Sequence, residues 1–221
     1  MQKAHRDVLQ GFALVGAFLG WNALSALLYR ELHLDGSSPL SPLRSSLILL
    51  GTAVTCLGIV WLGCVRFGLG SFRALGWSFQ GRPGWMLLFG ALQSGVFSLL
   101  AYAATASLYG WAGVEGLTSA VLSMPAGERV FYLVMGSKVA FAEESLFRGF
   151  VLPTLAVSWG TLAAVLISSL LFAVYHRTTA PPFLLIKLTF GVVSAGSVLL
   201  CRSLVPTTIA HAALWTIFGD N

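Results

Sequence analysis

Two adjacent carboxylates and an arginine stand inside an otherwise apolar stretch of the sequence. Glu143, Glu144 and Arg148 are flanked by apolar and small residues at 131–142 and at 149–156. A charged side chain near the centre of a bilayer costs about 2.5–3.5 kcal/mol on insertion scales. Charges kept in such a stretch therefore indicate a function for these side chains.

A helical conformation would separate the two carboxylates. Glu144 and Arg148 are four residues apart, so they share one helical face and can form an ion pair. Glu143 points about 100° away and has no charged neighbour on its own face. Burial without a partner raises the pKa of a glutamic acid towards neutrality, which suits a general base. Glu143 is therefore the candidate base, and the Glu144–Arg148 pair is either structural or part of the catalytic machinery.

Two histidines lie in apolar segments that could pack against this helix. His176 ends one such segment, and His211 lies in the last one. Each could be an ordinary core or interfacial residue, but both could also share a water molecule with the candidate base and move protons near neutral pH. Lys138 and Lys187 also lie in apolar segments. Their side chains could extend to the membrane surface or contact a substrate.

The composition places the chain among membrane proteins. Of its 221 residues, 57% are hydrophobic and only 10% are charged, whereas soluble domains have about 25% charged residues. The net charge of +5 comes from Lys and Arg scattered over short loops, so it predicts membrane topology and no nucleic-acid binding. Cys56, Cys64 and Cys201 show no disulfide or zinc spacing. We expect one integral membrane domain over residues 1–221.

The apolar segments predict an all-α fold, a polytopic transmembrane helical bundle of about seven spans, within a range of six to eight. The expected spans are residues 8–29, 46–65, 85–108, 129–157, 161–176, 181–201 and 204–218. The first resembles a signal peptide but is too long for one, so we interpret it as a retained span. Pro153 is expected to kink the end of the fourth span. The stretch 66–84 could form a short helix on the membrane surface, and 109–128 is expected to be a Gly-rich connection.

The motifs match a known family in their order and in their placement on apolar segments. They are Glu143-Glu144-x-x-x-Arg148, Phe172-x-x-x-His176 and His211. They resemble those of the CPBP family, the CAAX protease and bacteriocin-processing (Abi) group of glutamic intramembrane endopeptidases. The resemblance implies that Glu143 and His176 activate a water molecule, which attacks a peptide carbonyl. It further implies that His211 helps to hold the oxyanion, while Glu144 and Arg148 support the site.

The resemblance covers residues 85–219, the expected catalytic core, and implies a membrane-embedded polar cavity. The family's last motif commonly has Asn or a similar polar residue four positions after the histidine, where this chain has Trp215. An indole N–H can donate a hydrogen bond but cannot accept one. The Trp215 indole could therefore substitute for the amide; otherwise the oxyanion site is rearranged, or Thr216 or a backbone group completes it. Phe172 and Trp215 are also candidate substrate contacts.

The function implied by the resemblance is hydrolysis of a peptide bond in a membrane-associated or lipidated peptide or protein. The reaction would be CAAX-type cleavage, or processing of a C-terminal sorting signal or a leader. The implied enzyme needs water but no cofactor, and its partners are membrane lipid and a lipoprotein-like substrate. We expect a multi-pass protein of a cell membrane, of the bacterial inner-membrane type.

Three other functions stay open at this level. The chain could be a zinc metalloprotease with Glu143, Glu144, His176 and His211 as ligands, although it has no His-Glu-x-x-His motif. It could be a proton-coupled carrier, because intramembrane Glu and His also form proton relays, although it has no pair of Gly/Pro-broken spans in matching halves. The departure at Trp215 also leaves room for a non-catalytic membrane scaffold or immunity protein.

Overall fold

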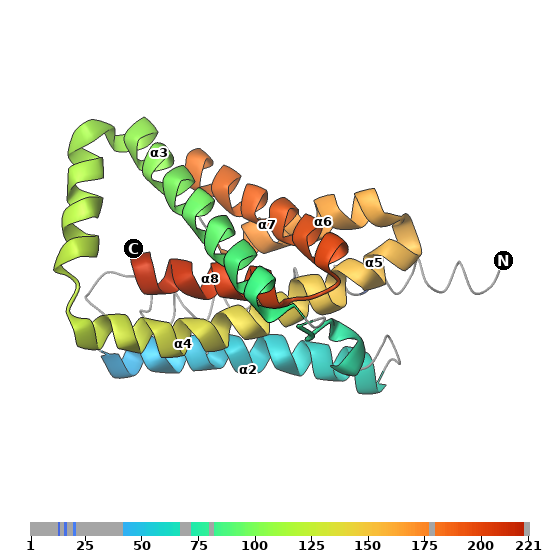
Figure 1. Ribbon diagram of the computed structural model, residues 1–221. Coiled ribbons are helices and arrows are strands. Elements are labelled where there is room, and N and C mark those ends of the chain that lie inside the picture. Colours follow the sequence, from blue (N-terminus) through green and yellow to red (C-terminus); the bar gives the residue numbers. More distant parts are fainter. Residues whose placement is uncertain are drawn as a thin grey trace.

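The computed structural model describes residues 42–66, 72–79, 82–176 and 180–218, together with residues 13, 16 and 20. Every regular element in these ranges is helical (Figure 1), which confirms the all-α prediction. The elements are α2 (Pro42–Arg66), the 3₁₀ helix η1 (Phe72–Leu75), α3 (Pro83–Ser123), α4 (Ala126–Glu144), the π-helix η2 (Ser145–Val151), α5 (Leu152–Trp159), α6 (Thr161–Tyr175), α7 (Pro181–Cys201) and α8 (Val205–Phe218). The span expected at 8–29 lies almost wholly outside the described residues.

Several helices have the composition of membrane segments. By length and apolar composition, α3 and α7 could each cross a membrane, and α6, α8 and the Leu49–Val65 part of α2 are shorter apolar helices. Large apolar side chains such as Trp61, Leu99 and Leu200 are exposed on the helix surfaces. An exposed apolar surface of this kind indicates contact with an apolar environment or with a partner.

The helix that carries both carboxylates changes its winding within the motif. From 126 to 159 the chain stays helical, but α4 gives way to the π-helix η2 before α5 begins. The Leu152 N–H donates to the Phe147 carbonyl, five residues back. Pro153 cannot donate to the carbonyl four residues before it and would crowd that group. The distortion therefore lies in the turn before Pro153, and not at the end of the helix as expected.

The predicted Gly-rich connection at 109–128 is wrong, because most of it is helical. Helix α3 continues to Ser123 and is broken only at Gly110, which has φ 65° and ψ −164°. This backbone region is essentially open only to glycine. After Gly110 the chain turns sharply and runs back to the start of α4 (Figure 1). At the start of α4, a hydrogen bond from the Arg129 guanidinium to the Val121 carbonyl spans the junction between α3 and α4.

The stretch expected to form a surface helix at 66–84 is an anchored loop in its described part. It contains the 3₁₀ turn η1 and a non-helical segment at 76–79. The Leu204 N–H donates to the Gly76 carbonyl at 2.9 Å. The Trp77 indole N–H donates to the Ser145 hydroxyl at 3.2 Å, at the first residue of η2. The loop therefore ties the beginning of η2 to the connection between α7 and α8.

Helix α8 occupies the centre of the bundle. It packs against both α3 and α4, while α7 packs against α6, and α2 covers the other side of α4 (Figure 1). On α4, a Cβ at Gly136 would lie only 2.3 Å from the Cβ of Trp215 on α8. Small residues allow helix backbones in membranes to approach closely. Gly136 thus permits the contact that brings α8 alongside the carboxylates of α4.

Candidate active site

The ion pair expected between Glu144 and Arg148 is present and buried. Arg148 Nη1 lies 3.2 Å from Glu144 Oε1, and neither side chain is more than 1% exposed. The guanidinium also lies over an aromatic ring, with its Cζ 4.2 Å from the centroid of Phe172. A desolvated cation–π contact of this kind is worth about 2 kcal/mol. Arg148 therefore links the motif on α4 and η2 to helix α6.

Glu144 is held from α8 as well as from its own helix. Thr207 Oγ1 donates to Glu144 Oε2 at 3.2 Å. His211 Nδ1 lies 3.1 Å from Glu144 Oε1. Both oxygens of this fully buried carboxylate thus have partners, as a buried charge requires. Glu144 is consequently the group that joins α4 to α8 within the site.

The other carboxylate faces the two histidines. Glu143 Oε2 lies 3.5 Å from His211 Nε2 and 3.9 Å from His176 Nε2. The Glu143 side chain is 3% exposed, and its Oε2 has no hydrogen-bond partner among the described residues. Glu143, His176 and His211 therefore converge on one point, although the first and the last are 68 positions apart in the sequence. Each comes from a different helix or helix end.

Both imidazoles are oriented by bonds through their other nitrogen. His176 Nδ1 lies 2.8 Å from the Phe172 carbonyl oxygen, which can only accept, so this Nδ1 carries a proton. His211 Nδ1 faces the Glu144 carboxylate, another acceptor, at 3.1 Å. The Nε2 atoms of both rings are thereby turned towards Glu143. In its neutral form each Nε2 is an acceptor, so a molecule that both donates and accepts hydrogen bonds, such as water, fits between the three side chains.

The same three side chains have the composition of a metal site. One ligand atom each from Glu143, His176 and His211 lies within 4.8 Å of the others. Two imidazoles and a carboxylate can bind catalytic zinc with a fourth position open for water. Each imidazole also has an orienting acceptor on its other nitrogen, as metal-bound histidines commonly do. Glu144 faces away from this point towards Arg148, so the described ligand set has three members, and not the four considered from sequence.

A cavity of about 440 Å³ adjoins the two histidines. It is walled by α3, α7, α8 and the end of α6, and its polar groups include His176, His211 and Lys187. Most of the wall is aromatic or aliphatic, with side chains that include Phe97, Phe172, Phe183, Phe190, Trp215 and Phe218. A mostly apolar cavity next to hydrolytic groups can accommodate an apolar part of a substrate beside the bond to be cleaved.

The two candidate contact residues, Phe172 and Trp215, both line the cavity but have different neighbours. Phe172 is buried, and its ring lies 4.4 Å from that of His176 and 5.7 Å from that of His211, between centroids. The Phe172 ring therefore packs against both imidazoles and against the Arg148 guanidinium. Trp215 lines the cavity and packs on Gly136. The Thr216 hydroxyl donates to the Ala212 carbonyl of its own helix at 3.0 Å, so its proton is already engaged within α8.

Sequence reasoning missed three residues of this site. Thr207, which donates to Glu144, lies one turn before His211 on α8, and this spacing of four was the signal available. Phe190 of α7 has its ring 5.0 Å from that of His211. It had no distinguishing pattern within an apolar helix. Trp77 holds Ser145 from a loop, and no local pattern links the two.

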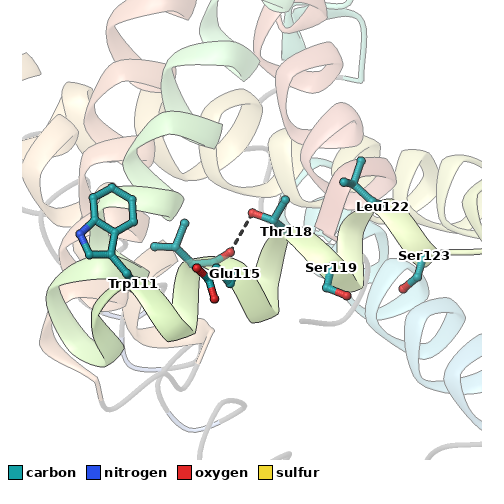
Figure 2. A pocket seen from close by; sticks show the side chains of 7 residues that line it. Trp111, Glu115, Thr118, Ser119, Leu122 and Ser123 are labelled. Atoms are coloured by element: carbon teal, nitrogen blue, oxygen red, sulfur yellow. Dashed lines mark hydrogen bonds between the residues drawn. The ribbon is translucent and has the colours of Figure 1, made fainter.

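A second hollow lies along the later part of α3 and has few reactive side chains in its wall. Figure 2 shows that Trp111, Glu115, Thr118 and other residues of one helical face line it. The Thr118 hydroxyl donates to the Val114 carbonyl at 2.7 Å. Glu115 is its one titratable group. The cluster around Glu143 thus remains the candidate active site.

Comparison with known families agrees with the motifs. Residues 125–217 match the family described as Rce1-like, type II CAAX prenyl endopeptidase Rce1-like. The matched region runs from the start of α4 to near the end of α8 and contains the residues of all three motifs. The resemblance to the CAAX protease family is therefore confirmed. No curated protein and no solved structure matches the chain.

Proposed function

Because residues 125–217 match the family described as Rce1-like, type II CAAX prenyl endopeptidase Rce1-like, we propose that this protein is a glutamic intramembrane peptidase. The observation that carries this proposal is the convergence of Glu143 Oε2 with the Nε2 atoms of His176 and His211. A base, a positioned water molecule and a donor for the oxyanion are what uncatalysed peptide hydrolysis lacks. The three side chains can supply all of these functions without a Ser or Cys nucleophile.

In the proposed first step, water binds between Glu143 and His176. Glu143 takes one proton from this water, while His176 Nε2 accepts a hydrogen bond from the other O–H and fixes its direction. The resulting hydroxide attacks the peptide carbonyl, which forms a tetrahedral oxyanion. In the proposed mechanism His211, whose Nδ1 faces the Glu144 carboxylate at 3.1 Å, acts in its protonated form and donates from Nε2 to this oxyanion.

In the second step, the proton held by Glu143 passes to the leaving amine as the C–N bond breaks. The products are a carboxylic acid and an amine, and Glu143 returns to its ionised form. Glu144 and Arg148 act only through His211, because their mutual contact and the Thr207 hydrogen bond fix the carboxylate that orients the imidazole. The Trp215 indole N–H, on the cavity wall, is the proposed second donor to the oxyanion.

The proposed setting is a bundle of about seven spans in a cell membrane, of the bacterial inner-membrane type. The proposed substrate is a membrane-associated peptide or lipidated protein, cleaved in CAAX fashion or at a C-terminal sorting signal or leader. The apolar wall of the cavity beside the histidines supports this substrate class, since an acyl or prenyl chain would lose its contact with water or lipid headgroups there.

The experiment that tests the proposal compares the membrane peptides of cells that make wild-type protein or Glu143→Gln. We expect a precursor to accumulate with Glu143→Gln and its fragment to disappear. Glu115→Gln is the matched control, because Glu115 is an exposed carboxylate on α3 that lines a different hollow. An unchanged peptide profile with Glu143→Gln, at wild-type protein levels, would contradict the proposal.

One specific observation favours a second candidate, a zinc-dependent peptidase. Glu143, His176 and His211 lie close enough to bind one ion, and zinc bound by such a set lowers the pKa of its water to about 7. Metal analysis of the purified protein separates the two candidates. Stoichiometric zinc, together with activity that is lost on chelation and restored by zinc, would favour the metal-dependent enzyme.

A further inference from the structure

Lys187 is a cation on the wall of the cavity beside the site. It lies on α7, and its neighbours on the same helical face, Phe183, Ile186 and Phe190, line the cavity with it. The side chain is half-buried. Nothing in the proposed hydrolysis uses it, because the base, the water-orienting group and the oxyanion donor are all assigned to other residues.

The charge of Lys187 has no ion-pair partner in the part of the chain that the structure describes. The ion pairs recorded there join Glu143 and Glu144 to His176, His211 and Arg148. Coulombic interactions link Lys187 to Glu143 and to His176, so the ammonium lies in electrostatic range of the reacting groups. A cation among aromatic side chains gains most from an anion that enters the cavity with a ligand.

The position of Lys187 fits an anion close to the bond that is cleaved. Lys187 precedes Phe190 by three residues, a rise of about 4.5 Å along the helix. The ring of Phe190 lies 5.0 Å from that of His211. An extended peptide advances about 3.5 Å per residue, so a few residues of substrate span the distance between the proposed oxyanion donor and Lys187.

We propose that Lys187 is a specificity-determining residue that binds the C-terminal carboxylate of the substrate. This inference rests on the proposed peptidase function and adds a recognition element to the same cavity. A peptide bond near a free carboxyl terminus would be placed at Glu143 when its carboxylate pairs with the Lys187 ammonium. The same bond in a chain that continues, or that ends in a neutral amide, would lack this contact.

The test uses two synthetic peptides with the sequence of the precursor that accumulates with Glu143→Gln. One ends in a free carboxylate and the other in a carboxamide, and both are assayed with purified protein in phosphatidylcholine vesicles. We expect wild-type kcat/KM to be about tenfold or more higher for the carboxylate, as for loss of a charged hydrogen bond. Lys187→Met should reduce this ratio to near one, and Lys187→Arg should retain most of it.

Lys138→Met is the matched control, because Lys138 is an exposed lysine of α4 outside the cavity wall. It should keep the wild-type ratio. A ratio that Lys187→Met leaves unchanged, with both peptides slowed equally or not at all, would overturn the proposal. The proposal would also be overturned if the effect of Lys187→Met on cleavage depended on added phosphatidylglycerol and not on the peptide terminus. That result would assign the ammonium to a lipid headgroup. Failure of the wild type to cleave either peptide would instead overturn the peptidase function, and this inference with it.

Discussion

Replacing Arg148 removes the one guanidinium of the site and leaves a buried carboxylate behind. Glu144 is fully buried and loses its cation at 3.2 Å in Arg148→Met. Breaking a buried ion pair from one side costs about 3–5 kcal/mol, and the contact over Phe172 at 4.2 Å is lost as well. Thr207 and His211 still contact Glu144. We therefore expect a loss of about 3–5 kcal/mol in the free energy of unfolding.

A double substitution separates the unpaired charge from the lost packing. In Glu144→Gln/Arg148→Met neither charge is buried, so we expect the double variant to be more stable than Arg148→Met alone by roughly 1–3 kcal/mol. Arg148→Lys keeps the charge but not the planar group that lies over Phe172, and it should fall between wild type and Arg148→Met.

The assay is equilibrium unfolding of the purified protein in mixed micelles, followed by circular dichroism. Arg82→Met is the control, because Arg82 is exposed at the start of α3 and its loss should change stability by less than about 0.5 kcal/mol. Two results would refute the reasoning. One is an Arg148→Met protein as stable as Arg82→Met. The other is a double variant destabilised by the sum of its two single substitutions.

Three further predictions concern the support and the chemistry of the site. Thr207→Val removes the donor to Glu144 Oε2 and should lower stability by about 1.5–3 kcal/mol in the same assay; an unchanged protein would show that the bond is weak. Gly136→Ala places a Cβ 2.3 Å from that of Trp215 and should cost about 1–3 kcal/mol. Gly95→Ala, with open space around its Cβ, should be tolerated, and equal stability of the two variants would refute this close contact. Peptide cleavage should persist in excess chelator, and activity that only added zinc restores would contradict the water mechanism.

The individual helices were predictable where the chain marks their ends. Pro181 opens α7, Gly160 with φ 82° separates α5 from α6, and the expected segments 161–176 and 204–218 correspond closely to α6 and α8. These residues act locally, through a fixed φ or a positive φ, so their effect can be inferred without knowledge of the fold. The Glu144–Arg148 pair was predictable for the same reason, because both residues share one helix face.

Features that depend on packing between helices were not predictable from one chain. The π-helix η2 has no distinctive spacing of apolar residues that would reveal it in the sequence. Gly110 breaks α3, but its sequence surroundings do not distinguish it from Gly113 or Gly116. The contact of Thr207 with Glu144 joins residues 63 positions apart. Such pairings follow from how α8 lies against α4, which is set by many weak contacts together.

The role of Glu143 as the base can be tested by the rate of peptide-bond hydrolysis. The decisive measurement is the cleavage rate of the purified Glu143→Gln protein in vesicles, with the accumulated precursor peptide as substrate and Glu115→Gln as the control. General acid–base groups contribute typically 10²–10⁴-fold, so we predict at least about a hundredfold loss of kcat for Glu143→Gln with wild-type unfolding behaviour. A Glu143→Gln protein that cleaves at the rate of Glu115→Gln would contradict the assignment of Glu143 as the base.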